Sequence, residues 1–66
     1  MQSLKTFAEV EERVSDLVSA IVYVSPNHVI YEAESLDKAN EAAIELKDFD
    51  AYTISKDSRW FVSVPL

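Results

Sequence analysis

Few side chains in this protein could perform acid–base, nucleophilic or metal chemistry. His28 is the single histidine of the 66 residues, and there is no cysteine. No serine stands in a nucleophile context, and a domain this small offers no deep cleft for a pair of carboxylates. A metal site at His28, Glu32 and Glu34 is one alternative on a single strand face, but these residues lack a recognised ligand spacing. We therefore expect no catalytic residue, no metal and no cofactor, and predict that the protein is not an enzyme.

Nucleotide and nucleic-acid binding are also disfavoured. Glycine is absent, which excludes glycine-rich phosphate loops because their tight turns need residues without a Cβ. Lys56, Arg59 and Trp60 form a basic-aromatic group that could stack on single-stranded nucleic acid, but turn residues beside a core tryptophan are the favoured interpretation. The net charge of −6 opposes phosphate binding and instead steers a protein toward basic surfaces.

Carboxylates form two columns at helical spacing. The first contains Glu9, Glu12 and Asp16, and the second contains Asp37, Glu41 and Glu45. If two helices cover the same face of a sheet, these six carboxylates share one surface, relieved mainly by Arg13 and Lys38. Such a surface could engage a basic groove on another protein. The alternative interpretation is an ordinary solvated helix face.

Two segments have the spacing of amphipathic helices. Apolar residues recur every three or four positions from Phe7 to Ile21, and Thr6 followed by Glu9 fits a capping box. We therefore predict a first helix over residues 6–19. Ser35 is an N-cap candidate for a second helix over residues 35–47.

The remaining segments favour strands. Residues 21–24 and 29–33 flank turn residues Ser25–His28, and residues 52–55 and 60–64 flank a second turn at 56–59. The predicted order is αββαββ, an α+β fold with two helices on one face of a four-stranded antiparallel sheet of order 1-2-4-3, a permuted ferredoxin-like arrangement. Residues 3–10 align with 35–42, so the unit could be a duplicated αββ. An open three-stranded sheet, with Ile21–Val24 in a long first helix, is the alternative.

Two helices cover only one side of a sheet, so strand alternation determines what the other side exposes. We predict that the helix-facing set is Trp60, Val62, Val64, Tyr52, Ile54, Val29, Tyr31 and Ala33. Phe61, Thr53, Ser55 and Ile30 are then expected on the open side, joined by either Ile21 and Tyr23 or Val22 and Val24. An exposed apolar patch of this kind indicates an interface, although a shift of one residue in register would reverse every face.

Length limits the stability that the protein can reach. A chain of 66 residues forms one domain, residues 1–66, and buries only about 60% of its unfolded surface. Without disulfides, dense packing or a partner must supply the rest. No segment resembles a targeting signal, and the longest apolar run, Leu17–Val24, is far short of the ~20 residues of a membrane helix. We expect a cytoplasmic protein.

One short stretch has a recognisable likeness. Residues 31–42, Tyr-Glu-Ala-Glu-Ser-Leu-Asp-Lys-Ala-Asn-Glu-Ala, resemble a strand-to-helix junction in several small bacteriophage proteins. These include an inhibitor of bacterial RNA polymerase and some anti-CRISPR proteins. The resemblance implies a small acidic domain that blocks a larger machine, and it transfers no functional residue.

Together these features predict a non-catalytic protein-binding module, an inhibitor or adaptor that docks its acidic helical face or its exposed sheet on a larger protein with a basic surface. The expected partner-binding residues are Glu9, Glu12, Asp16, Asp37, Glu41, Glu45, Ile30 and Phe61. We expect no direct contact with nucleic acid or membrane. The alternative is a self-associating structural or regulatory subunit, such as a homodimer.

Overall fold

Two αββ units follow one another along the chain. The computed structural model describes residues 2–66, with side chains from Phe7 onward. The elements are α1 (Gln2–Val14), β1 (Ala20–Ser25), β2 (His28–Ala33), α2 (Leu36–Glu45), the short 3₁₀ helix η1 (Lys47–Phe49), β3 (Tyr52–Lys56) and β4 (Arg59–Pro65). The predicted αββαββ order is therefore the observed one.

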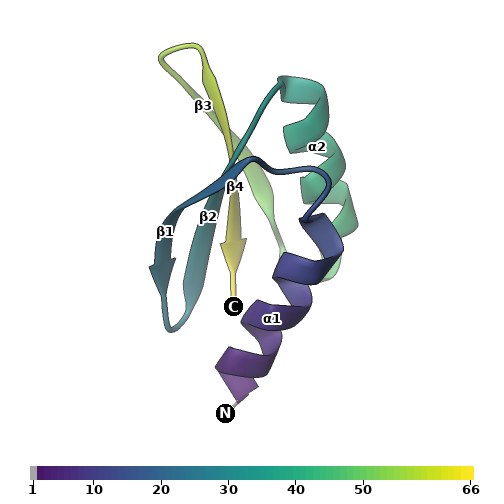
Figure 1. Ribbon diagram of the computed structural model, residues 1–66, viewed down its shortest axis with the longest axis vertical. Coiled ribbons are helices and arrows are strands. Elements are labelled where there is room, and N and C mark those ends of the chain that lie inside the picture. Colours follow the sequence, from purple (N-terminus) through teal and green to yellow (C-terminus); the bar gives the residue numbers. More distant parts are fainter. Residues whose placement is uncertain (1) are drawn as a thin grey trace.

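The four strands form one antiparallel sheet of order β1-β2-β4-β3. Both helices lie on the same side of this sheet, so the protein has the predicted two-layer α+β architecture (Figure 1). The three-stranded alternative is wrong, because residues 20–25 form an edge strand rather than the end of a helix. The relationship to a permuted ferredoxin-like fold stays a prediction. No helix in residues 2–66 is long and apolar enough to cross a membrane.

The predicted ends of the first helix are wrong at both sides. α1 begins at Gln2 rather than near Thr6, because glutamine, leucine and lysine before Thr6 are good helix formers that need no cap there. It ends at Val14 rather than at residue 19. The amides of Leu17 and Val18 both donate to the Val14 carbonyl, at 2.8 and 3.2 Å, and close a turn there.

The second helix starts as its sequence predicts. Ser35 has extended backbone angles, and its hydroxyl oxygen accepts a hydrogen bond from the Lys38 amide at 3.2 Å. After α2, Leu46 turns into the core and η1 follows. Asp50 then adopts a left-handed conformation with φ 62°, the position that a glycine would usually fill.

The core lies between the helices and the sheet. It contains Val10, Val14, Val29, Tyr31, Ala33, Ala39, Ala42, Leu46, Val62 and Val64. Most of these side chains are small, and Tyr31 is the largest that is fully buried. The hydroxyl of Tyr31 is therefore a polar group placed in an otherwise apolar layer.

The predicted faces are correct for β2 and for the apolar set of β4, but wrong for β3. Val29, Tyr31 and Ala33 are buried on the helix side. On β3, Thr53 lies opposite Val62 and Ser55 lies opposite Trp60, so both face the helices. Tyr52 and Ile54 lie opposite Ser63 and Phe61, on the open side.

The second hairpin turn explains this register. Lys56 pairs with Arg59, so only Asp57 and Ser58 form the loop, and both have positive φ angles of 54° and 64°. Two consecutive left-handed residues are typical of a type I′ turn, whose twist matches that of the strands. A two-residue loop requires Ser55 to lie opposite Trp60, which reverses the faces expected for β3.

Candidate functional site

The strand β1 is the most exposed apolar element of the described chain. It pairs with β2 on one side and ends the sheet on the other. Four consecutive large apolar side chains are exposed by 40–54%: Ile21, Val22, Tyr23 and Val24. Residues 17–31 contain no Asp, Glu, Lys or Arg. Native edge strands are usually protected by charge, proline or short length, so a six-residue uncharged edge is an unusual surface.

A β-bulge divides β1 between the two sides of the sheet. Ile21 lies opposite Tyr31 on the helix side, and Tyr23 lies opposite Ile30 on the open side, so Val22 is the extra residue. Both sequence alternatives, which placed Ile21 with Tyr23 or Val22 with Val24, assumed strict alternation and are wrong. The bulge increases local twist but leaves β1 one residue longer than β3.

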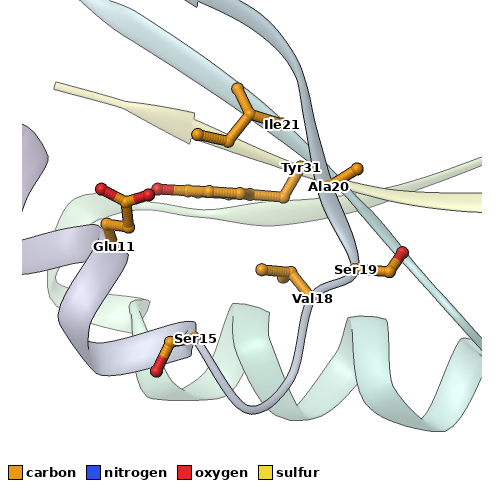
Figure 2. A pocket seen from close by; sticks show the side chains of 7 residues that line it. All are labelled: Glu11, Ser15, Val18, Ser19, Ala20, Ile21 and Tyr31. Atoms are coloured by element: carbon orange, nitrogen blue, oxygen red, sulfur yellow. The ribbon is translucent and has the colours of Figure 1, made fainter.

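A pocket of about 310 Å³ lies between α1 and the helix side of β1. Its lining includes Glu11 and Ser15 of α1, Val18 and Ser19 of the following turn, Ile21 of β1 and Tyr31 of β2 (Figure 2). The walls are mainly apolar. The ionisable groups in the lining are the Glu11 carboxylate and the Tyr31 hydroxyl.

Tyr31 contributes a buried polar group to this pocket. Its side chain is 1% exposed, and its hydroxyl has no hydrogen-bond partner among the described residues. The ring extends across the pocket with the hydroxyl toward the Glu11 carboxylate (Figure 2). Burial, with a smaller contribution from the negative charge of Glu11, raises the pKa of Tyr31 to about 12. The hydroxyl is therefore protonated at neutral pH.

The open side of the sheet carries Ile30 and Phe61, as predicted from sequence, but neither is widely exposed. Arg59 lies over the Phe61 ring, 5.4 Å from its centroid. The same guanidinium forms two hydrogen bonds of 2.7 and 2.8 Å with the Glu32 carboxylate. Those hydrogen bonds lower the pKa of Glu32. Phe61 is thus partly shielded by a bidentate ion pair.

A transverse row crosses all four strands beside Phe61. It runs Tyr23, Ile30, Ser63 and Tyr52 through successive cross-strand pairs. Ser63 is buried and hydrogen-bonded to His28 Nε2, whereas Tyr23 and Tyr52 are 52% and 51% exposed. The apolar surface of the open side is therefore concentrated at its two edge strands rather than at its centre.

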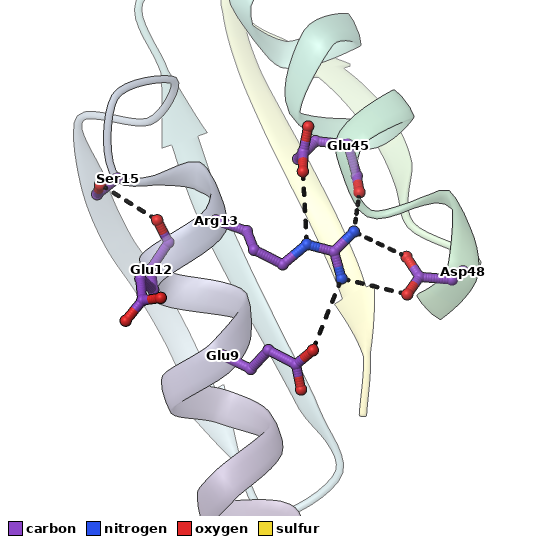
Figure 3. Close-up of polar contacts among 6 residues, drawn as sticks. All are labelled: Glu9, Glu12, Arg13, Ser15, Glu45 and Asp48. Carbon is purple, nitrogen blue, oxygen red and sulfur yellow. Dashed lines mark hydrogen bonds and ion pairs between the residues drawn. The ribbon is translucent and has the colours of Figure 1, made fainter.

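The six predicted acidic residues are all exposed, but Arg13 divides them. Its guanidinium binds Glu45 at 3.5 Å and lies 4.0 Å from Glu9, which joins members of the two columns. Figure 3 shows Glu9 and Arg13 projecting toward α2, while Glu12 projects to another side of α1. Asp16, Asp37 and Glu41 form no ion pair among the described side chains. The acidic surface is therefore less uniform than the sequence predicts.

Asp48 is the strongest partner of Arg13, and the sequence columns did not include it. Two hydrogen bonds of 3.1 and 3.2 Å join the guanidinium to its carboxylate. They lower the pKa of Asp48. Arg13 also donates to the Glu45 carbonyl and lies 5.7 Å from the centre of the Phe49 ring. This cluster holds α1 against the end of α2.

The structure does not bring together the residues of the other two sites considered from the sequence, the basic-aromatic group and the metal site. Arg59 is bound to Glu32, and Trp60 lies on the opposite side of the sheet with Ala33, so the basic-aromatic group does not converge. Within residues 2–66, no group of three or more His, Cys, Asp or Glu side chains could hold a metal ion. The Nε2 atom of His28 is instead hydrogen-bonded to the hydroxyl of Ser63.

Sequence reasoning placed two residues of β1 in the exposed patch of the open side, but it did not identify the free edge of β1 or the Glu11–Tyr31 pocket as a site. The sequence signal for β1 is the absence of Asp, Glu, Lys and Arg from Leu17 to Tyr31. This signal was missed because the strand was expected to alternate strictly between the two sides of the sheet. The pocket had no sequence signal, because it depends on how far α1 lies from β1. Ile44 on α2, 72% exposed, was likewise assigned no role.

Comparison with known protein families, with curated proteins and with solved structures finds no match for this chain. The likeness to small bacteriophage inhibitors therefore rests on residues 31–42 alone.

Proposed function

We propose that this protein is a small non-catalytic protein-binding module, an inhibitor or adaptor, that docks on a larger protein through the edge strand β1. One observation carries the proposal: four consecutive apolar side chains of β1 are exposed by 40–54% on an uncharged edge. A surface of this kind is costly to leave in water and is typical of interfaces.

The backbone of β1 determines the form of the partner. An edge strand presents unpaired N–H and C=O groups that an extended segment can join as a further strand. Such a segment would meet Tyr23 on the open side and Ile21 on the helix side. The other edge is less suited, because β3 has five residues, ends in Lys56 and places the hydroxyl residues Thr53 and Ser55 on its helix side.

Charge selects among extended segments. The net charge of −6 and the exposed carboxylates Glu12, Asp16 and Glu41 favour a partner with basic residues near the docking strand. These charges act mainly on the rate of association, while the desolvated contacts at β1 govern dissociation. In this proposal the acidic columns steer the partner and β1 holds it.

The pocket beside β1 is better suited to binding a ligand than to acid–base catalysis. Its Tyr31 hydroxyl has a pKa of about 12, far from the neutral values that suit a general acid or base. Among the side chains that the structure describes, Glu11 is the one other ionisable residue in its lining. This chemistry supports a binding role for the pocket.

Self-association is the second candidate. Because β1 carries no charge, an antiparallel pair of β1 strands related by a two-fold axis would place no like charges opposite each other. Sedimentation equilibrium of Tyr23→Lys and Phe61→Asp distinguishes the surfaces. Loss of a dimer in the first variant alone indicates the β1 edge, and loss in the second alone indicates the open face.

The docking proposal is tested with peptides selected from a random twelve-residue library displayed on phage. The wild-type protein is the bait, and affinities are measured by fluorescence polarisation. Val22→Lys adds a charge to the β1 edge, and Ser55→Lys adds the same charge to the β3 edge as a matched control. We expect extended peptides with basic residues whose binding is lost with Val22→Lys and retained with Ser55→Lys. Selected peptides that bind Val22→Lys as tightly as wild type would refute docking at β1.

A further inference from the structure

The pocket under Ile21 has chemistry that the docking strand alone does not use. Its walls are the apolar side chains of Val18 and Ile21, and it holds about 310 Å³. The hydroxyl of buried Tyr31 on the sheet and the carboxylate of exposed Glu11 on α1 lie beside each other at this pocket (Figure 2). A mainly apolar pocket bordered by two oxygen atoms is suited to a long side chain with a polar tip.

The Tyr31 hydroxyl is the stronger evidence for a ligand. It is buried, lines the pocket and has no hydrogen-bond partner among the described residues. A buried polar group without a partner costs about 1–3 kcal/mol, so native structures usually satisfy it. The Glu11 carboxylate lies beside this hydroxyl and belongs to an exposed residue (Figure 2). A donor that displaces the carboxylate would therefore reach the hydroxyl oxygen, and the hydroxyl hydrogen could still turn toward Glu11.

The charge of Glu11 specifies the kind of donor. The carboxylate is a negatively charged acceptor that favours a cationic donor, and the phenolic oxygen beside it can accept a second N–H. A guanidinium has a planar set of five N–H donors and stacks on aromatic rings, whereas an ammonium is a compact point charge. We propose that the pocket receives an arginine side chain of the partner, with its methylene stem against Val18 and Ile21 and its guanidinium between Glu11 and Tyr31.

Strand geometry explains how arginine arrives there. Successive side chains of a strand point to opposite faces, and Ile21 lies on the helix side with Tyr31. A partner residue that pairs with Ile21 therefore directs its side chain toward the pocket. The source of the arginine rests on the proposed docking at β1, but the preference of the pocket for a guanidinium does not.

The preference is tested with small molecules by NMR on isotopically labelled protein. The probe is n-butylguanidinium chloride, and the control is n-butylurea, a neutral molecule of nearly the same shape, at matched ionic strength. We expect weak, saturable shifts at Ser15–Ile21 and Tyr31 with the guanidinium and at least about tenfold weaker binding of the urea. Glu11→Gln and Tyr31→Phe should each weaken guanidinium binding about fivefold or more, since hydrogen bonds to charged groups contribute about 1.5–3 kcal/mol. Glu12→Gln removes an equal charge from the same helix outside the pocket and should change binding less than about twofold.

Three results would overturn the assignment: no saturable shift at the pocket, equal binding of the urea, or unchanged binding in Glu11→Gln. Each leaves docking at β1 standing if selected peptides still require an uncharged Val22 position. Conversely, guanidinium binding at the pocket together with peptides insensitive to Val22→Lys would retain the arginine pocket and reject docking at β1.

Discussion

Ile21 of β1 lies directly opposite Tyr31 of β2 on the helix side of the sheet. Two residues later the bulge at Val22 has shifted the register, and Tyr23 faces the open side. One edge strand therefore contributes to both surfaces of the domain. Its helix side borders the pocket that contains the Tyr31 hydroxyl, and its open side begins the transverse row that ends at Tyr52.

Alkaline pH should destabilise the protein through Tyr31. Its pKa rises from 10.0 to about 12 in the folded state, chiefly because burial disfavours the phenolate. The unfolded chain loses this proton first, so stability is complete below pH 10 and falls as the pH rises through about 12. A shift of this size corresponds to about 2–3 kcal/mol. Urea unfolding between pH 9 and 12 should show the loss in the wild type and a smaller loss in Tyr31→Phe.

Tyr31→Phe should cost little at neutral pH. It removes a hydroxyl without a hydrogen-bond partner and keeps the ring in the core, so we expect a change within about 1 kcal/mol, or a gain. A loss above about 2 kcal/mol at pH 7 would indicate that the hydroxyl has a hydrogen-bond partner in solution, which would contradict an unsatisfied hydroxyl.

Acid should loosen the contact between the helices. Arg13 lowers the pKa of Asp48 through two hydrogen bonds, so the contribution is present above the unfolded-state value of 3.8 and is lost as the pH falls through the lower folded-state pKa. Asp48→Asn should be less stable than wild type at pH 7, and the difference should shrink as the pH falls below 3.8 and then through the lower folded-state pKa. The free energy of unfolding from urea titrations at each pH measures this.

Glu32→Gln is the matched comparison, because Arg59 lowers the pKa of Glu32 in the same way on the other side of the sheet. The two pairs share no residue, so their effects should add in the double variant. If Asp48→Asn is less stable than wild type by the same free energy of unfolding at pH 2 as at pH 7, the difference does not come from the ion pair.

The second hairpin turn offers a gain in stability. Ser58 has φ 64°, a conformation that costs a residue with a Cβ about 1–2 kcal/mol and costs glycine almost nothing. After the greater entropy of unfolded glycine is subtracted, Ser58→Gly should stabilise the protein by about 0.5–1 kcal/mol. Ser55→Gly, in the neighbouring strand, should instead destabilise it. Thermal unfolding of the two variants gives opposite shifts, and shifts of equal sign would contradict the type I′ assignment.

Association with a basic peptide should depend on the unpaired carboxylates. Replacing Glu12, Asp16 and Glu41 by glutamine leaves the Arg13 cluster intact and removes three charges. We expect association to slow by about tenfold at low salt, with little change in dissociation. Stopped-flow fluorescence with a selected peptide measures both rates. The difference should vanish at 1 M salt, where the Debye length is about 3 Å; equal association rates at low salt would leave the carboxylates as a solvated face.

The sequence predicted a helix or strand correctly where a local pattern, such as an N-cap residue or strict alternation, determines it. Ser35 capped α2 as expected, and β2 alternates between buried and partly exposed residues along its full length. The fold class follows from these elements, because two helices and two hairpins have few ways to bury their apolar sides.

The failures within the sheet share a physical cause, which is that register is a property of pairs of strands. Tyr52 and Ile54 are the larger apolar residues of β3 and were assigned to the helix side, but the two-residue turn places Thr53 and Ser55 on that side instead. The bulge in β1 is likewise invisible in its uninterrupted apolar run. The pocket could not be predicted because it depends on the distance between α1 and β1, and the Arg13 contact with Asp48 depends on how α2 ends.

Docking through β1 predicts a direct signature in the NMR spectra of the protein with a selected peptide bound. Amide protons of β1 that do not bond to β2 should become protected from hydrogen exchange, and nuclear Overhauser effects should join peptide backbone protons to those of residues 21–24. The β3 amides should be unchanged. Protection confined to β3 or to the helices, with exchange at β1 as fast as in the free protein, would contradict docking at β1.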